Sequence, residues 1–398
     1  MLEESEARRR ILSLVPVPTA VELPLEKSLG RYAARDLFAT LALPPCPNSA
    51  MDGYALHVED CGKAPHTVRI QGEQPAGPDR GLAVRPGGCV RIFTGAPLPA
   101  DTAAVIMQED TALFPDLAEV RILTAADPGE FIRAEGSDLC AGQKILNAGD
   151  RITPQRLSLL AGQGLTSLPC GRAPRVHVLT TGDELIPAGQ PLTIRGCIHN
   201  SNGPMLQALA AQAGAESSTS HALDRLDILT DSIRRALENH DVLVLSGGVS
   251  VGDHDLVKPA LESLGISLEF WRVRLKPGKP FLFTRHGGKL IFGLPGNPVS
   301  AFVTAVLFLL PALRRFAGAS MELTAPPAAR ATLTMPVANK GDRPHYLRGV
   351  FDFPAGGFTP LGLQQSHATG ALAAANALLR LEPDADEPAG SVHQVILF

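Results

Sequence analysis

The 398-residue chain has little surplus charge of either sign and no long apolar run. Its 36 Lys and Arg residues nearly balance 40 Asp and Glu, which leaves a formal net charge of −4. That charge is too small to indicate binding to nucleic acid or to a membrane surface through bulk electrostatics. The longest apolar stretch, residues 301–313, is interrupted by Thr304 and Pro311 and falls short of the ~18 residues that a membrane span needs. It predicts a buried helix instead.

Cysteine is scarce as well, and its spacing is irregular. No CxxC pair occurs, so nothing in the pattern predicts a zinc site or a redox dithiol. The six cysteines are Cys46, Cys61, Cys89, Cys140, Cys170 and Cys197. The charged start MLEESEARRR is followed by the short, mainly apolar segment ILSLV, only five residues long, which does not fit a secretory signal. We therefore expect reduced thiols in a cytoplasmic protein with no nucleic-acid and no membrane partner.

Length and pattern predict several domains, two to four at roughly 150 residues each. Residues 1–45 begin with helical periodicity and end in the breaker LALPPCPNSA. Residues 46–138 change to short apolar alternations between Gly and Pro turns, which predicts an inserted β domain. Residues 139–172 return to helical signals, with Thr153 before a first-turn Pro154. We expect them to join residues 1–45 in one composite helical linker domain.

The rest of the chain predicts an α/β domain followed by a small β domain. Residues 173–322 alternate apolar strands with helical segments, which is typical of a mostly parallel sheet. Residues 323–398 return to short strands and glycines. The fold class is therefore α/β multidomain. In a parallel sheet, ligands bind at the carboxyl ends of the strands, and the polar motifs of residues 173–322 fall there.

A glycine-rich loop follows the strand in DVLVLSGGVSVGDHD. Ser246, Gly247 and Gly248 end the strand, and glycine lets backbone N–H groups approach a phosphate closely. The acids Asp253 and Asp255 follow before a helix. The alternative is a plain strand-to-helix turn, which the two acids make less convincing.

The same loop contains a formal G-x-S-x-G match centred on Ser250. This pattern would make Ser250 the nucleophile of a serine hydrolase. An elbow nucleophile sits directly at the strand end, however, and Ser250 lies five residues beyond Leu245. The hydrolase is kept as an alternative that an ester substrate and Ser250→Ala would test.

Acids also follow two other predicted strands. Asp183 and Glu184 lie in TGDEL, and Asp224 lies in HALDRLD. Each could cap a turn when taken alone. Together with Asp255 they would bring carboxylates from three strand ends into one cleft, where they would repel one another without a cation. Their oxygen ligands suit Mg²⁺, which usually also binds substrate phosphates.

Positive charge and helix-start signals occur nearby. Lys276 and Lys279 lie in KPGKP, where two prolines stiffen the turn, although exposed turn lysines are often only solvated. Pro280 stands where a P-loop would need Ser or Thr, which disfavours a P-loop NTPase. GLPGNPVS then opens a helix whose N–H groups and hydroxyl can bind an anion. Its candidate binding residues are Pro295, Gly296, Asn297 and Ser300.

Further polar residues interrupt the pattern outside the α/β region. Asp52, Thr94 and Asp138 stand in NSAMDGYA, FTGAPLP and AEGSDLC, and each is compatible with an Asx turn or a cap. In the C-terminal region Arg348 and Ser366 are candidate oxyanion ligands. Arg348 could equally be a charge at a strand edge.

Taken in order, these motifs resemble the molybdopterin molybdenumtransferase family, which is MoeA in bacteria and the gephyrin E-domain in animals. The matching segments are MDGYA, TGAPLP, EGSD, TGDEL, SGGVSVGDHD, KPGKP, GLPGNPVSA and QQSHATGAL, spread from about Ser13 to Leu381. The resemblance implies four subdomains: a composite helical one, an inserted β domain, a three-layer α/β domain like molybdopterin-binding proteins, and a C-terminal β-barrel. It also implies a homodimer with its site in a cleft between subunits.

The resemblance further implies a reaction and residue roles. The family cleaves the phosphoanhydride of adenylylated molybdopterin with Mg²⁺, inserts molybdate, and releases AMP and molybdenum cofactor. By motif match, the catalytic positions are Asp52, Thr94, Asp138, Glu184, Asp224, Asp255, Lys276 and Lys279, with Glu184, Asp224, Asp253 and Asp255 as candidate metal ligands. The matching molybdate pocket comprises Lys279, Pro280, Ser300, Arg348 and Ser366.

Two departures and one alternative accompany this resemblance. Pro47 stands where many members have an acid, and Arg272 where some have a lysine, which keeps the charge but alters its geometry. A non-catalytic molybdopterin-binding or scaffolding protein is the alternative function, and the complete acidic set argues against it. Other molybdenum cofactor assembly proteins are expected partners.

Overall fold

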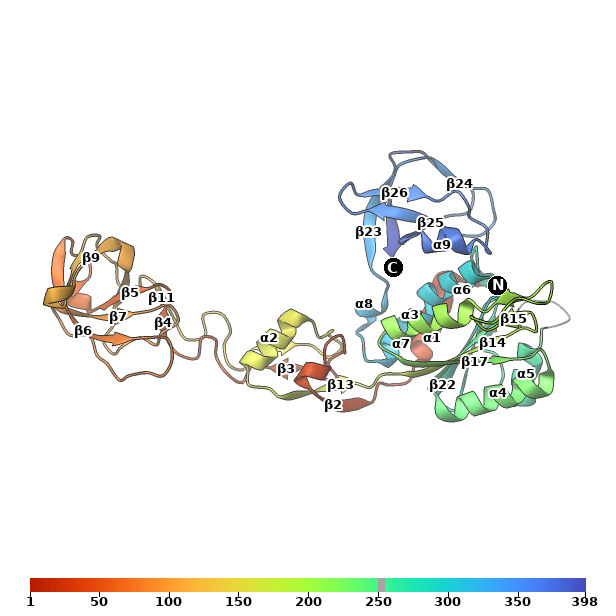
Figure 1. Ribbon diagram of the computed structural model, residues 1–398, viewed down its shortest axis with the longest axis horizontal. Coiled ribbons are helices and arrows are strands. Elements are labelled where there is room, and N and C mark those ends of the chain that lie inside the picture. The colour runs from red at the N-terminus through yellow and green to blue at the C-terminus, as the bar shows by residue number, and fades with distance from the viewer. Residues whose placement is uncertain (250–254) are drawn as a thin grey trace. The chain divides into compact units, whose positions relative to one another are not determined.

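The computed structural model describes residues 1–249 and 255–398 and divides them into two compact units (Figure 1). The larger unit contains Met1–Arg35 and Asn147–Phe398, and the smaller unit is Asp36–Leu146. The chain therefore leaves the larger unit once and returns to it. Each unit is described by itself.

A six-stranded sheet with the order β17-β14-β18-β22-β21-β19 lies at the centre of the larger unit. Its strands are β14 (Arg175–Thr181), β17 (Glu216–Ala222), β18 (Val242–Ser246), β19 (Phe270–Trp271), β21 (Leu282–His286) and β22 (Lys289–Leu294). The first four in spatial order are parallel; β21 pairs antiparallel with β22, and β19 pairs antiparallel with β21. The near-continuous apolar sequence of β18 fits a strand buried on both faces.

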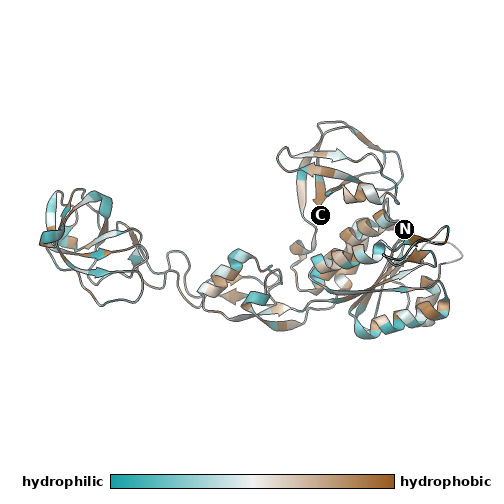
Figure 2. Ribbon diagram, viewed as in Figure 1, coloured by the Kyte–Doolittle hydropathy of each residue, from teal (hydrophilic) through white to brown (hydrophobic). Residues whose placement is uncertain are grey.

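Helices cover both faces of this sheet and make it three-layered. They are α3 (Asn202–Gln212), α4 (Leu226–Asn239), α5 (Val257–Ser263), α6 (Pro298–Thr304), the π turn η5 (Ala305–Leu309) and α7 (Leu310–Phe316). Alternate strand residues separate the two cores: Val242 and Val244 pack with α3 and α6, whereas Leu243 and Leu245 pack with α4 and α5. Figure 2 shows apolar residues concentrated in these layers.

The apolar run of residues 301–313 forms part of a buried helix, as predicted. Among the described residues, one helix, Pro298–Phe316, is long and apolar enough to cross a membrane, but 89% of that stretch is buried inside the protein. Its side chains belong to the same core as strands β14 and β18.

The chain segments that precede and follow the smaller unit pair with each other within the larger unit. β2 (Ala20–Pro24) pairs with β13 (Ser167–Gly171), beside α2 (Pro154–Gly162) and η1 (Leu25–Lys27). Thr153 accepts a hydrogen bond from the Arg156 N–H at the start of α2, which confirms the helix start expected at Thr153-Pro154.

Helix α1 (Glu4–Leu14) lies apart from this linker region. Its buried residues Ala7 and Ile11 join the core of the α/β layers, and β1 (Leu2–Glu3) pairs with β20 (Val273–Arg274). The predicted boundary that groups all of residues 1–45 with 139–172 stays a prediction, and the packing of α1 is the observation that bears on it.

The C-terminal region is a closed barrel with the order β23-β26-β25-β27-β29. Its strands are β23 (Ala328–Leu333), β25 (His345–Asp352), β26 (Gly357–Pro360), β27 (Ala377–Leu381) and β29 (Val392–Leu397). Accessory elements are α8 (Met321–Thr324), α9 (Thr369–Ala373), and the paired strands β24 (Val337–Asn339) and β28 (Ala385–Glu387). Closure removes the free sheet edges that would otherwise be open to pairing.

The smaller unit is built on a second six-stranded sheet, with the order β8-β5-β7-β6-β10-β9. Its strands are β5 (Gly53–Leu56), β6 (His66–Gln74), β7 (Gly88–Ile92), β8 (Ala104–Met107), β9 (Thr111–Phe114) and β10 (Glu119–Ile122). Short pairs flank it: β4 (Asn48–Ser49) with β11 (Ile132–Arg133), and β3 (Leu37–Phe38) with β12 (Lys144–Leu146). The chain is thus an α/β multidomain protein with a three-layer domain, an inserted β region and a C-terminal barrel.

Candidate functional site

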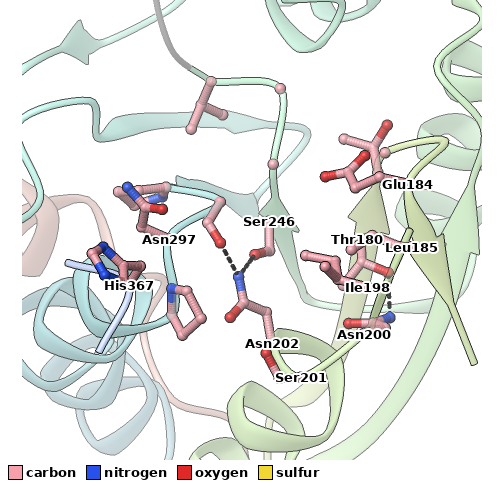
Figure 3. A pocket seen from close by; sticks show the side chains of 18 of the residues that line it. Thr180, Glu184, Leu185, Ile198, Asn200, Ser201, Asn202, Ser246, Asn297 and His367 are labelled. Atoms are coloured by element: carbon pink, nitrogen blue, oxygen red, sulfur yellow. Dashed lines mark hydrogen bonds between the residues drawn. The ribbon is translucent and has the colours of Figure 1, made fainter. Parts of the chain in front are cut away.

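A pocket of about 660 Å³ opens at the carboxyl ends of β14, β17, β18 and β22 (Figure 3). This is the sheet edge where the sequence predicts a ligand site. The predicted residues that line it are Glu184, Asp224, Ser246, Gly247, Gly248, Pro280, Pro295, Gly296 and Asn297. They come from segments more than 100 residues apart in the chain.

The glycine loop after β18 requires glycine at two successive positions. Gly247 has φ +97° and Gly248 has φ +61°. A Cβ on Gly247 would lie 2.5 Å from the Thr181 carbonyl oxygen, which no side chain could tolerate. The loop therefore brings its backbone close to the end of β14 and leaves its pocket side free for a ligand.

Two helices begin at this pocket. Asn202 starts α3 and Pro298 starts α6, and both residues line the cavity. The first N–H groups of a helix lack partners inside it, and the helix dipole places partial positive charge at the same end. The pocket is therefore suited to phosphate or another anion.

Asn202 ties these segments together. Its side-chain amide donates to Ser246 Oγ at 2.9 Å and to the Gly296 carbonyl at 2.7 Å (Figure 3). Its Oδ1 is buried and has no hydrogen-bond partner among the described residues. Beside it, Asn200 donates to Thr180 Oγ1 at 2.8 Å. The sequence analysis missed both amides, although the run HNSN directly before a helix was a usable signal.

We define the acidic side of the site as Asp224 and Asp255. Thr181 Oγ1 donates to Asp224 Oδ1 at 2.6 Å. A Cβ built on Gly248 would lie 3.2 Å from the methyl group of Thr181. The same Cβ would lie 3.8 Å from Asp255 Oδ1. The two acids therefore flank the ends of β14 and β18.

Asp255 is the perturbed acid of the pair. Burial raises its pKa to about 6, and a backbone hydrogen bond from Val257 only partly opposes that rise. Its Oδ1 is buried with no hydrogen-bond partner among the described residues. Asp255 does not itself line the pocket but lies beside Gly248, which does. A buried carboxylate oxygen without a partner is a candidate for cation binding or proton transfer near neutral pH.

The remaining predicted acids differ in their surroundings. Glu184 is exposed and lines the pocket. Asp183 Oδ1 accepts from the Asp224 N–H at 2.9 Å, so this side chain holds the loop that carries Asp224. Asp253 and Ser250 lie outside the described residues. Within the described part of the chain, no group of three His, Cys, Asp or Glu side chains forms a ready metal cluster.

We define the basic side of the site as Lys276, His345 and Arg348. The KPGKP loop runs beside β25: the Lys276 N–H donates to the Pro344 carbonyl at 2.8 Å, and the Tyr346 N–H donates to the Lys276 carbonyl at 2.7 Å. The loop therefore joins the barrel to the α/β layers. Lys276 is exposed, as is the second lysine of the motif, Lys279.

Arg348 is a fully buried cation, not a charge at a strand edge. Its Nη2 donates to the carbonyl oxygens of Leu363 at 2.6 Å and Gln365 at 3.2 Å. Its Nε and Nη1 are buried and have no partner among the described residues. Arg348 is not among the residues that line the pocket. A guanidinium with two unused nitrogen atoms is a group that an oxyanion can pair with.

His345 stays neutral beside this cation. Burial lowers its pKa to about 4, and the charges of Lys276, Arg348 and Arg343 add to the effect. Its Nε2 is buried without a partner in the described structure. The sequence analysis missed this residue, because a histidine inside an alternating strand gives no signal.

The segment around Ser366 links the basic side to the pocket. Asn297 Nδ2 donates to Ser366 Oγ at 3.0 Å, and the Val299 N–H donates to the Ser366 carbonyl at 3.1 Å. The next pocket-lining residues are His367 and Thr369, which the sequence analysis also missed. Ser300 is 4% exposed on α6 and does not line the cavity.

The KPGKP loop also packs against α6. A Cβ on Gly278 would lie 2.6 Å from Thr304 Cγ2 and 3.7 Å from the Ser300 carbonyl oxygen. The predicted molybdate residues Lys279, Pro280, Ser300, Arg348 and Ser366 therefore belong to four segments: the KPGKP loop, α6, β25 and the segment around Ser366. Each of these segments contacts at least one of the others.

Three predicted residues belong to the smaller unit. Asp52 Oδ1 accepts from the Thr94 N–H at 2.7 Å and from Thr94 Oγ1 at 2.8 Å. These bonds lower the pKa of the exposed Asp52 carboxyl. Asp138 is also exposed, and its backbone N–H donates to the Leu43 carbonyl. The structure thus pairs Asp52 with Thr94.

Trp271 marks the rim of the glycine loop. Its Nε1 donates to the Val249 carbonyl at 3.3 Å. The guanidinium of Arg272, a residue with φ +71°, lies 4.0 Å from the centre of the indole ring. This contact is a cation–π interaction.

Comparisons with known proteins agree along the chain. The MoeA N-terminal region (domain I and II) matches residues 2–164, a probable molybdopterin binding domain matches residues 177–315, and the MoeA C-terminal region (domain IV) matches residues 330–398. A Haemophilus influenzae molybdopterin molybdenumtransferase is 34% identical over 96% of this chain and 95% of its own. A Mycobacterium tuberculosis molybdopterin molybdenumtransferase 2 is 35% identical over 98% and 97%.

A solved structure gives the same fold. The molybdopterin biosynthesis MoeA protein from Pyrococcus horikoshii OT3 superposes with a TM-score of 0.86 at 26% identity and covers 100% of both chains. The correspondence extends over the inserted β region, the α/β layers and the barrel.

Proposed function

The chain belongs to the molybdopterin molybdenumtransferase family, whose members act in molybdenum cofactor biosynthesis, and from this premise we propose that it acts on adenylylated molybdopterin. In the proposed reaction the phosphoanhydride is cleaved with Mg²⁺, molybdate is inserted, and AMP and molybdenum cofactor are released. The observation that carries the proposal is the pocket at the carboxyl ends of the strands, where the glycine loop, the starts of α3 and α6, and the acids Glu184 and Asp224 lie together.

The glycine loop and the two helix N-termini suit the phosphates of this substrate. Gly247 and Gly248 keep side chains away from the loop, and α3 and α6 begin at the pocket, so the positive ends of their helix dipoles face it. Asn202 holds the loop of Ser246 against that of Gly296 through its amide. These contacts fix the shape of the phosphate site before the substrate binds.

The acidic side fits Mg²⁺ through its number of carboxylates. Asp224 and Asp255 are two carboxylates, and Mg²⁺ typically takes one or two protein carboxylates together with substrate phosphates and water. When bound, Mg²⁺ would neutralise negative charge on the phosphoanhydride. Asp255, with its pKa at about 6, can accept at Oδ1 the proton of the water that attacks the linkage.

The basic side fits the second substrate, molybdate. Arg348 offers Nε and Nη1 to a tetrahedral dianion, and Ser366 offers its hydroxyl from the adjoining segment. Lys276 and Lys279 lie at the exposed end of the same loop and would offset charge that develops on the cleaved phosphates. No protein thiol is required, since the pterin substrate carries its own sulfur atoms.

We further propose a homodimer in which the Asp52–Thr94 pair and Asp138 of one copy complete the pocket of the other. Mixing Asp52→Ala and Asp255→Ala variants tests this arrangement. If the residues act across copies, half of the dimers are mixed and each has one intact site, so about a quarter of wild-type activity returns. If all these residues act within one copy, the mixture stays as inactive as each variant alone.

One assay tests the function itself. Purified protein is incubated with adenylylated molybdopterin, molybdate and Mg²⁺, and AMP release is followed against a protein-free control. AMP release that requires both the protein and Mg²⁺ supports the proposal. Binding of the pterin with no AMP above the control would contradict it and favour a scaffolding role.

A further inference from the structure

A second pocket of about 610 Å³ lies in the larger unit, away from the candidate site. Its walls come from the segment before the smaller unit, the segment after it, the end of α3, α7, α8 and the stretch that follows α8. The residues that matter for its chemistry are Arg31, Tyr32, Arg151, Arg314 and Glu322. Three of these five carry a permanent positive charge.

The two pockets occupy opposite ends of the same helices. Asn202 at the start of α3 lines the first pocket, and Ala211 and Gln212 at its end line the second. Eleven helical residues span about 16 Å at 1.5 Å each. Along the helical stretch from α6 to α7, Pro298 at the start lines the first pocket and Arg314 near the end lines the second. The second pocket is therefore a separate place in the fold.

The arginines of this pocket are held in position without carboxylate partners. Arg31 Nη2 donates to the Gly171 carbonyl at 2.7 Å, and Arg314 Nη1 donates to the Ala325 carbonyl at 2.9 Å. Among the described residues neither they nor Arg151 form an ion pair. The nearest acid in sequence to Arg151, Asp150, is bound by Arg156 at 3.1 Å. The pocket therefore contains two guanidinium groups oriented by carbonyl oxygens and a third, Arg151, and it has three cations against one acid, Glu322.

Arg151 and Arg314 are close enough to affect one another. Burial lowers the pKa of Arg314, and the charge of Arg151 lowers it further, although Tyr32 acts in the opposite direction. Like charges held together inside a cavity are unfavourable unless an anion binds between them.

Tyr32 adds a hydrogen-bond donor. Tyr32 is 7% exposed and lines the pocket. Burial raises the pKa of Tyr32, so the phenol keeps its proton. Glu322 is the acid on this wall, and its carboxylate accepts hydrogen bonds from Ser320 and from its own backbone N–H.

We propose that this pocket, lined by Arg31, Tyr32, Arg151 and Arg314, binds the phosphate group of a small anion. Guanidinium groups match phosphate geometry and bind it through paired, charge-assisted hydrogen bonds. A neutral phenol can donate one more. The phosphate can belong to inorganic phosphate or to a phosphate monoester, and the inference does not depend on the reaction proposed for the first pocket.

Equilibrium binding on the full chain tests the proposal, with inorganic phosphate and AMP as separate probes at constant chloride concentration. Because the first pocket also suits phosphate, each titration is made with the wild type, Arg151→Gln and Tyr32→Phe. Arg151 is exposed and has no ion pair to lose, so its replacement should leave the fold intact. Arg330→Gln, an exposed arginine on β23, is the matched control.

The expected result is a phosphate site that Arg151→Gln weakens about tenfold, as the loss of one charge-assisted hydrogen bond should, and that Arg330→Gln leaves unchanged. Tyr32→Phe should weaken the same site by a smaller factor. AMP binding with the same dependence on Arg151 identifies a monoester as the ligand, whereas phosphate binding without AMP binding identifies the free oxyanion.

Two results would overturn the proposal. One is binding of both probes that is equal in the wild type and Arg151→Gln. The other is a change in sedimentation of Arg151→Gln without any change in anion binding, which would show that the arginines contact acids of a second copy.

Discussion

The acidic and basic sides of the site are built from different parts of the chain and lack opposite partners. Asp224 and Asp255 follow strands of the α/β sheet, and Asp255 has a carboxylate oxygen with no donor. Arg348 belongs to the barrel, and two of its nitrogen atoms have no acceptor. Under the proposed function, each side binds an incoming ion: Mg²⁺ on the acidic side and molybdate on the basic side.

The largest expected effect comes from the acidic side. Asp255→Asn keeps the shape of the side chain and removes its charge and its ability to accept a proton. AMP release should fall on the order of 10²–10⁴-fold. Glu238→Gln, an exposed neutralisation on α4, is the matched control and should leave the rate unchanged. Equal rates for Asp255→Asn and the wild type would remove Asp255 from the mechanism.

The basic side should respond in a different kinetic parameter. Arg348→Gln removes the two nitrogen atoms without partners and should weaken the use of molybdate by about 10–100-fold, the effect of one or two charge-assisted hydrogen bonds. AMP release, measured against molybdate concentration, should show the loss as a higher KM. Because Arg348 also binds Leu363 and Gln365, circular dichroism must show a native fold. A fall in kcat with no change in KM would contradict the separation of the two sides.

The two sides should also titrate in opposite directions. His345 has its pKa lowered to about 4, so the unfolded chain binds its proton more tightly, and the stability that depends on neutral His345 is lost as pH falls from about 6.5 toward 4. Asp255 has its pKa raised to about 6, so its stabilising contribution is complete below about 3.8 and is lost as pH rises through about 6.

Thermal unfolding of single variants separates these contributions. His345→Gln should flatten the fall in Tm between pH 6.5 and 4, and Asp255→Asn should raise Tm at pH 7.5 by a few degrees but not at pH 4, in line with about 1 kcal/mol. Arg330→Gln, on the same barrel, should follow the wild type throughout. Parallel pH profiles for His345→Gln and the wild type would show that this histidine is not the titrating group.

The smallest effect is expected from the residue that bridges two loops of the phosphate site. Asn202→Ala removes hydrogen bonds to Ser246 and Gly296 and should raise KM for the pterin substrate several-fold, since each bond contributes about 1 kcal/mol. The KM for molybdate should not change, because Asn202 belongs to neither side. Asn239→Ala, at the exposed end of α4, is the matched control. An equal change in both KM values would show that Asn202 acts on the whole site.

Part of the site could be predicted from the sequence, because the signals for it lie in neighbouring residues. The strand alternation, the glycines of the β18 loop and the Pro298 helix start each have a local cause, and the structure shows the corresponding elements. Glu184 and Asp224 follow strand ends, and parallel strands bring such residues to one edge.

Other parts could not be read in this way. The hydrogen bonds that hold Arg348 in place go to the carbonyls of Leu363 and Gln365, which lie outside its own strand. His345 is perturbed by Lys276, a residue 69 positions away along the numbering. Such properties arise from long-range packing, and one sequence carries no local signal for them.

The chain carries a single tryptophan, and its indole is hydrogen-bonded to Val249 at the edge of the glycine loop. Its emission is therefore an intrinsic optical reporter of that one region, free of background from any other indole. If the proposed substrate binds at this loop, stopped-flow fluorescence follows its arrival in the unlabelled wild-type protein, and Trp271→Phe supplies the dark reference trace.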